Sequence, residues 1–101
     1  NTMEAASIIN SSFIVLDRPN PLGGNLVNGP LLNMTCCESG YGRVPITHVH
    51  GMTIGELTLL FNDYLLTRNI SQSSLTSSSS SSNNIKDLVI VKMIGWLRYM
   101  V

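Results

Sequence analysis

The sequence has 101 residues, enough for one domain at most, and 44% of them are apolar. Only 12% are charged, about half the usual share, and six basic side chains balance six acidic ones. No Lys or Arg run indicates a nucleic acid or anionic membrane partner, and the longest apolar runs, residues 13–16 and 88–91, are too short to span a bilayer. We therefore expect globular structure, with no nucleic-acid partner and no membrane insertion.

The chain begins with Asn1 rather than Met and stops at Val101, shortly after the second apolar run. The low charge also suits a piece of protein that neighbouring segments cover. We therefore expect an internal fragment whose partner is the missing remainder of its own domain. A signal peptide upstream would direct the full-length protein to secretion or to the lysosome.

Residues 2–9 are predicted to be the end of a helix, because Met3, Ala6 and Ile9 fall on one helical face. The continuous apolar run from Phe13 to Leu16 follows, and polar residues bound it on both sides. This pattern is typical of a parallel strand that is buried on both faces.

Regular structure is hard to recognise from Asp17 to Met52, where four prolines and several glycines interrupt the chain. A loop of this length inside a domain is usually functional or disordered. Prolines favour an ordered path, because each lowers the chain entropy lost on folding. We expect an ordered, functional loop here.

A helix is predicted to begin after Thr53, because Thr53 and Glu56 have the spacing of a capping box. Apolar residues then recur at helical spacing, and the helix is expected to end near Arg68. Residues 71–84 are almost all Ser, Thr and Asn. Such a tract buries too little apolar surface to offset its chain entropy, which predicts a disordered insertion.

A second buried strand is predicted from Leu88 to Val91. Two wholly apolar strands joined through a helix imply parallel pairing with a right-handed crossover. The predicted fold class is α/β, an incomplete parallel sheet with a strand–helix–strand unit, and residues 1–101 form part of one domain. Since two parallel strands are marginal alone, we expect this chain not to fold cooperatively by itself.

Candidate site residues collect where the two strands end, because sites in parallel α/β sheets lie beyond the carboxyl ends of the strands. Free amides of residues 52–54, at the start of the helix, would suit an anion or a hydroxyl. Polar side chains of the loops and the helix start are expected to converge on this rim; they are Asp17, Arg18, Asn20, His50, Thr53 and Glu56. Simpler interpretations stay open, in which Asp17 and Arg18 pair with each other or cap backbone groups at the strand end, and Glu56 is only the capping acid.

The pattern predicts no metal and no cofactor. His48 and His50 alternate, and with Cys36 and Cys37 they raise the possibility of zinc. Structural zinc sites usually use a spaced CxxC pair rather than adjacent cysteines, which also rarely bond to each other. Neither a phosphate-binding loop nor a GxGxxG motif occurs.

Several segments resemble consecutive blocks of the bacterial exo-β-N-acetylmuramidases, a glycoside hydrolase family long catalogued as a domain of unknown function. In chain order, the matching segments are residues 2–6 (TMEAA), 13–24 (FIVLDRPNPLGG), 29–32 (GPLL), 45–46 (PI), 50–57 (HGMTIGEL) and 88–93 (LVIVKM) with Gly95, Trp96 and Arg98. The match covers nearly the whole chain except the Ser tract. The LDRPNP and HGMTIGEL blocks are its most specific parts.

The resemblance implies a Rossmann-like N-terminal domain joined to a second domain, with the site in the cleft between them. It also implies the release of terminal N-acetylmuramic acid from peptidoglycan-derived muramyl saccharides. Glycosidases usually use two carboxyl groups. By resemblance, one lies in an upstream Pro-Glu-His-Gly block that this chain lacks, and the other corresponds to Glu4. The residues that match family blocks and are expected to shape the site are Asp17, Arg18, Asn20, His50 and Glu56.

Two hypotheses follow from the sequence. In the first, the chain is a part of a muramidase-like hydrolase and is inactive as a fragment. In the second, it is a non-catalytic sugar-binding or structural α/β module.

Overall fold

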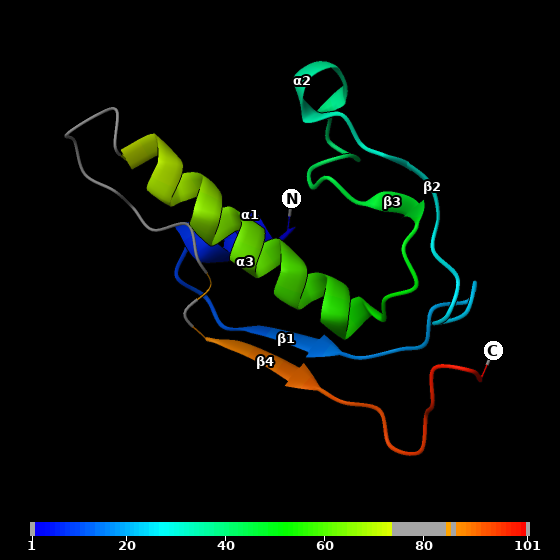
Figure 1. Cartoon of the computed structure of the whole chain (residues 1–101). Coiled ribbons are helices and arrows are strands. Elements are labelled where there is room, and N and C mark those ends of the chain that lie inside the picture. Colours follow the sequence, from blue (N-terminus) through cyan, green and yellow to red (C-terminus); the bar gives the residue numbers. More distant parts are fainter. Residues whose placement is uncertain (1, 74–84, 86, 101) are drawn as a thin grey trace.

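The computed structural model describes residues 2–73, 85 and 87–100. Helices and strands alternate along these residues, mostly in short elements. In chain order they are α1 (Thr2–Ile8), β1 (Phe13–Leu16), β2 (Asn28–Leu31), α2 (Met34–Cys37), β3 (Thr47–Val49), α3 (Ile54–Ser73) and β4 (Leu88–Val91). The predicted α/β class is confirmed (Figure 1).

The two apolar runs form one parallel sheet. β1 pairs with β4 along its whole length, from Phe13 opposite Leu88 to Leu16 opposite Val91. Backbone bonds extend the pairing at both ends, from the Phe13 amide to the Asp87 carbonyl (2.9 Å) and from the Asp17 amide to the Val91 carbonyl (3.0 Å). The predicted bounds and the parallel direction of both strands are confirmed.

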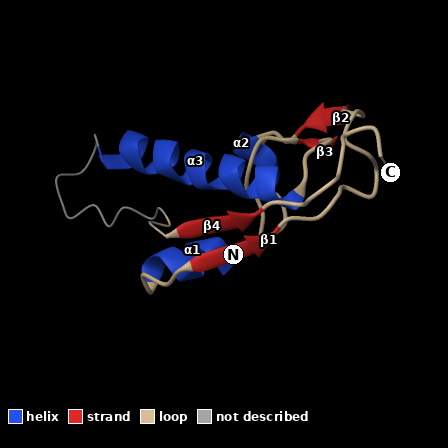
Figure 2. Ribbon diagram, turned by 90° about the horizontal axis from the view of Figure 1, so that it is seen from below, coloured by secondary structure: helices blue, strands red, loops and turns tan. Residues whose placement is uncertain are grey.

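Only one face of this sheet is covered within the described residues. Figure 1 shows α1 and α3 on the same side of β1 and β4. Figure 2 shows the molecule from below, and in this view no described helix or strand passes in front of β1 and β4. The uncovered face carries aliphatic side chains that are 44–63% exposed, namely Ile14, Leu16, Val89 and Val91. The prediction of strands buried on both faces is wrong for this chain, because nothing in its described part covers the second face.

The hydrophobic core is small and lies between the sheet and the helices. Met3 and Ala6 of α1 pack with Ile85, which lies three positions before Leu88, the first residue of β4. Partly buried side chains of both strands and α3 surround them, namely Phe13, Phe61 and Leu88. The predicted face of α1 is thus confirmed for Met3 and Ala6, whereas Ile9 lies beyond the end of the helix and is exposed.

The long loop contains structure that the sequence did not predict. β2 and β3 pair antiparallel, with an irregularity between Asn28 and Leu31, and α2 lies between them. Gly29 and Pro30 usually interrupt a strand. A two-stranded ribbon tolerates both, because Gly29 adopts a positive φ of 95° and a strand with a free edge does not require every amide to donate.

α3 begins at Ile54 with Thr53 as its cap, as predicted, but it ends at Ser73 rather than near Arg68. The first three residues of the predicted insertion are therefore helical, and the rest of it, residues 74–84, lies outside the described residues. None of the helices within the described ranges has both the length and the apolarity needed to cross a membrane.

Candidate functional site

Asp17 connects the end of β1 to the start of α3. Its side chain is buried, with only 9% of the residue exposed. One carboxylate oxygen, Oδ1, accepts from the Gly55 amide at 2.7 Å and from the Arg18 amide at 3.0 Å, and Oδ2 accepts from the Thr53 hydroxyl at 3.1 Å. A negative charge at a helix N-terminus is favourable, so Asp17 stabilises the helix start from outside the helix.

The predicted capping box is present. The Thr53 amide donates to Glu56 Oε2 at 3.0 Å, and the Glu56 amide donates to the Thr53 hydroxyl at 3.3 Å. Thr53 is only 2% exposed. The prediction of free amides for an anion is wrong at two of its three positions, because Thr53 donates to Glu56 and Met52 donates to His50 Nδ1 at 3.1 Å. These amides orient protein groups instead.

Gly55 allows α3 to approach the sheet this closely. A Cβ atom at position 55 would lie 2.9 Å from the Asp17 carboxyl carbon and 2.9 Å from Ile90 Cγ2. Any larger side chain would push the helix start away from the strand ends. The absence of a side chain at Gly55 therefore sets the geometry of the rim.

Arg98 joins this rim, and the sequence reasoning missed it as a site residue. Its guanidinium pairs with the Glu56 carboxylate and donates to the Gly51 carbonyl at 3.2 Å. Its own carbonyl accepts from the Gly24 amide at 3.3 Å. Arg98 lies in a block that matched the family, but its pairing with Glu56 spans 42 positions, and no local pattern in the sequence indicates it.

Arg18, Asn20 and His50 line a cavity of about 200 Å³ next to this network. Asn20 is held on both sides, since its Nδ2 donates to the Met52 carbonyl at 3.2 Å and its Oδ1 accepts from the Leu22 amide at 3.0 Å. His50 accepts a hydrogen bond at Nδ1, so its neutral ring carries the proton on Nε2. Arg18 Nη1 donates to the Asp17 carbonyl at 3.0 Å, which leaves the other guanidinium nitrogens for a ligand. The six predicted rim residues therefore do lie together, three in the hydrogen-bonded network of Asp17, Thr53 and Glu56 and three along the cavity.

Glu4 lies on a different element, α1, and its carboxylate pairs with Arg43 from the loop before β3. Burial alone would raise the pKa of Glu4, but its cationic neighbours, Arg43 among them, outweigh burial and lower it. A lowered pKa keeps the carboxylate ionised near neutral pH. It suits a nucleophile or a base rather than a proton donor.

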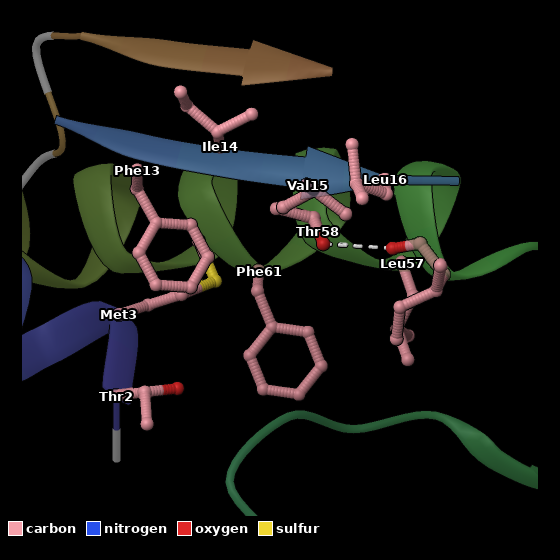
Figure 3. A pocket seen from close by; sticks show the side chains of 10 residues that line it. Thr2, Met3, Phe13, Ile14, Val15, Leu16, Leu57, Thr58 and Phe61 are labelled. Carbon is pink, nitrogen blue, oxygen red and sulfur yellow. Dashed lines mark hydrogen bonds between the residues drawn. The ribbon is translucent and has the colours of Figure 1, made fainter. Parts of the chain in front are cut away.

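A second cavity, of about 400 Å³, opens at the free edge of β1 between α1 and α3 (Figure 3). Its walls include Met3, Phe13 and Phe61, and no lining residue is titratable. The Thr58 hydroxyl at this wall donates to the Ile54 carbonyl at 2.7 Å and is therefore satisfied. This cavity lacks the groups that chemistry requires, so we assign it to folding rather than to a site.

The residues considered for zinc do not form a metal centre. Among the described residues, no three His, Cys, Asp or Glu side chains gather closely enough to hold a metal ion. Cys36 and Cys37 are exposed free thiols.

Comparison with known proteins supports the resemblance seen in the sequence. The family model of the N-terminal part of the exo-β-N-acetylmuramidase NamZ matches residues 1–101. The chain belongs to this family. It is 43% identical over 98 residues to the peptidoglycan β-N-acetylmuramidase NamZ of Bacillus subtilis strain 168, covering 97% of this chain and 19% of that protein.

A solved structure gives the same result for the fold. The crystal structure of a DUF1343 family protein from Bacteroides fragilis superposes with a TM-score of 0.69 at 36% identity, covering 97% of this chain and 21% of that one. The chain thus spans about a fifth of the length of these two relatives.

Proposed function

We propose that this chain is part of an exo-acting β-N-acetylmuramidase that releases terminal N-acetylmuramic acid from peptidoglycan fragments. The observation that carries the proposal is the cavity lined by Arg18, Asn20 and His50, beyond the carboxyl end of β1. Membership in the N-acetylmuramidase family supports the same substrate class. A loop at the end of a parallel strand is where α/β proteins bind ligands.

The chemistry of the cavity fits a muramyl sugar. N-acetylmuramic acid differs from N-acetylglucosamine by a lactyl group that carries a carboxylate. The Arg18 guanidinium supplies a permanent positive charge and paired N–H donors, the geometry that binds carboxylates best. Nε2 of His50 adds a donor for a sugar hydroxyl or the same carboxylate. Arg18 and His50 therefore serve as binding groups, with Asn20 holding the loop in place.

The network of Asp17, Thr53 and Glu56 then has a positioning role. It fixes the helix start and the loop after β1 relative to each other, because Asp17 bonds to both. Arg98 ties the segment after β4 into the same unit through Glu56. The predicted binding roles of Asp17, Thr53 and Glu56 thus become indirect: they support the residues that contact the sugar.

We assign Glu4 to one of the two carboxyl groups of the reaction, as the ionised partner. The proton donor would come from a part of the polypeptide outside these 101 residues. This chain alone is therefore expected to be inactive.

The proposal is tested by incubating the complete polypeptide with soluble peptidoglycan fragments that end in N-acetylmuramic acid at the non-reducing end. We expect free N-acetylmuramic acid, measured by mass spectrometry. The 101-residue chain serves as the inactive control. A complete polypeptide that binds the fragments without cleaving them would favour the alternative, a non-catalytic sugar-binding module.

The partner of the uncovered sheet face is, in this proposal, the remainder of the same polypeptide. Parallel sheets are normally covered on both faces, and here four aliphatic side chains stand open on one face. In the complete polypeptide, with Cys36 and Cys37 replaced by Ser, Val89→Cys should therefore react with a thiol reagent much more slowly than the control Ile8→Cys, whose position is 74% exposed on the end of α1. Equal reaction rates of the two introduced thiols would contradict the proposal.

A further inference from the structure

Among the described residues, β1 pairs with another strand along one edge only. That edge faces β4, and the two strands make up their sheet there. The amides of Phe13 and Asp17 donate toward β4, at 2.9 and 3.0 Å. Because the amides of a strand alternate in direction, those of Ile14 and Leu16 point to the opposite, free edge. A row of open backbone donors and acceptors of this kind is a template for a further strand.

The free edge opens into the apolar cavity of about 400 Å³ between α1 and α3 (Figure 3). Met3 lines it from α1, and Leu57 and Phe61 line it from α3. Leu57 and Phe61 are only half-buried, so part of their apolar surface is open to the cavity. A charged ligand would find no partner among the lining residues, whereas the apolar side chains of a strand would complete the burial of this wall.

The position of α1 indicates which segment covers this edge. α1 ends at Ile8 and leads through a short turn into β1, and Figure 1 shows it on the same side of the sheet as α3. A helix between two parallel strands of one sheet forms a crossover, and such crossovers are right-handed in about 98% of cases. Two right-handed crossovers on one face therefore move across the sheet in the same direction. Since α3 carries the chain from β1 to β4, a strand before α1 belongs on the other side of β1, at its free edge.

We propose that the free edge of β1 pairs with a parallel strand of the same polypeptide that directly precedes α1 in the chain. The sheet order is then this strand, β1 and β4. A strand–helix–strand unit takes about 30 residues or more, which places the new strand within about 30 residues upstream of Thr2. The chain spans about a fifth of its two relatives, so proteins of this family have room for it. The proposal does not depend on the proposed reaction.

The pairing also defines the chemistry of the new strand. Alternate side chains enter the cavity and contact Met3 and Phe61, and the others extend the apolar face of Ile14 and Leu16. The strand is therefore an apolar run of about four to six residues. Its carboxyl end lies beside Asp17, so the segment that follows it adds a wall to the rim of the candidate site.

The test replaces Phe61 in the complete polypeptide by the photoreactive amino acid p-benzoylphenylalanine and maps its cross-links by mass spectrometry after irradiation. Phe61 faces the cavity, so we expect cross-links to an apolar run within about 30 residues upstream of Thr2 (Figure 3). The control position is Leu59, which is 55% exposed on the same helix, lies outside the cavity lining and should give no cross-link to this run. Cross-links from position 61 only to sequence after Val101, or only between two copies of the protein, would overturn the proposal.

Hydrogen exchange of the wild-type complete polypeptide, followed by NMR, tests the pairing without any substitution. The amides of Ile14 and Leu16 should exchange at least about 100-fold more slowly than unprotected amides, as those of Phe13 and Asp17 do through their bonds toward β4. Neither measurement uses a substrate, so the absence of the proposed reaction would leave both results unchanged. Protected amides at Phe13 and Asp17 beside unprotected amides at Ile14 and Leu16 would overturn the proposal.

Discussion

Removing the Asp17 carboxylate tests whether the strand end and the helix start form one unit. In Asp17→Ala, the Thr53 hydroxyl and the Gly55 amide lose their acceptor in a place that water does not reach. A buried donor without a partner costs about 1–3 kcal/mol, so two of them predict a loss of about 2–6 kcal/mol in the free energy of unfolding. Asp17→Asn keeps the oxygen that faces Gly55 and should cost less, about 1 kcal/mol.

Urea unfolding of the complete polypeptide, followed by circular dichroism, measures these differences. The control is Asp63→Ala, which removes an exposed carboxylate from the same helix and should change the free energy of unfolding by no more than about 0.5 kcal/mol. If Asp17→Ala destabilises the protein no more than Asp63→Ala does, Asp17 does not hold β1 and α3 together, and the reasoning is wrong.

Four further predictions rest on the same structure. Gly55→Ala should destabilise the complete polypeptide by about 1–3 kcal/mol, because the new Cβ overlaps the Asp17 carboxyl group. The control Gly40→Ala should leave the stability unchanged, because position 40 has open space around it. Equal unfolding midpoints for the two variants would contradict this prediction. Glu4→Gln should lower turnover of muramyl substrates at least about 100-fold, and near wild-type turnover would remove Glu4 from the reaction. Because folding lowers the pKa of Glu4, the ionised carboxylate stabilises the fold above pH 4.5, and this contribution is lost as the pH falls through the lowered pKa. The difference in the free energy of unfolding between wild type and Glu4→Gln should therefore shrink in acid. A difference that stays constant with pH would contradict the ion pair. The 101-residue chain alone should unfold without a sharp thermal transition, and a sharp reversible one would show that it folds independently.

Features that depend on nearby residues were predictable from the sequence. β1 and β4 are short apolar runs between polar residues, and the structure has both with the predicted bounds. The Thr53–Glu56 capping box involves residues three positions apart, so its spacing alone predicts its hydrogen bonds.

Features that depend on distant partners were not. The pairing of β2 with β3 overrides the local signals of Gly29 and Pro30, because backbone bonds across the ribbon form only in the folded chain. The ion pair of Arg98 with Glu56 joins positions 42 residues apart, and no spacing rule reports it. Burial of the second sheet face was wrongly expected, because an apolar run indicates that a strand is covered but not which segment covers it.

The sequence predicted which of these residues lie near one another better than it predicted their contacts. Position after a parallel strand places Asp17, Arg18 and Asn20 at the end of β1, and the structure brings them next to Thr53 and Glu56 at the start of α3. The structure divides these residues into a hydrogen-bonded network and a cavity wall. That division depends on which hydrogen bonds each side chain makes, and the sequence does not encode it in any local pattern.

The most direct test of the central claim compares two chromogenic substrates, a β-N-acetylmuramide and the matching β-N-acetylglucosaminide, with the complete polypeptide. We expect the wild type to cleave the muramide faster than the glucosaminide. In Arg18→Ala, kcat/KM for the muramide should fall about 10–100-fold, which corresponds to the loss of one charge-assisted contact of about 1.5–3 kcal/mol. The control is Lys92→Ala, which removes an exposed positive charge outside the cavity lining and should change the cleavage rate of neither substrate. Cleavage of neither substrate, or an unchanged preference in Arg18→Ala, would contradict the assignment of this rim to a muramyl sugar.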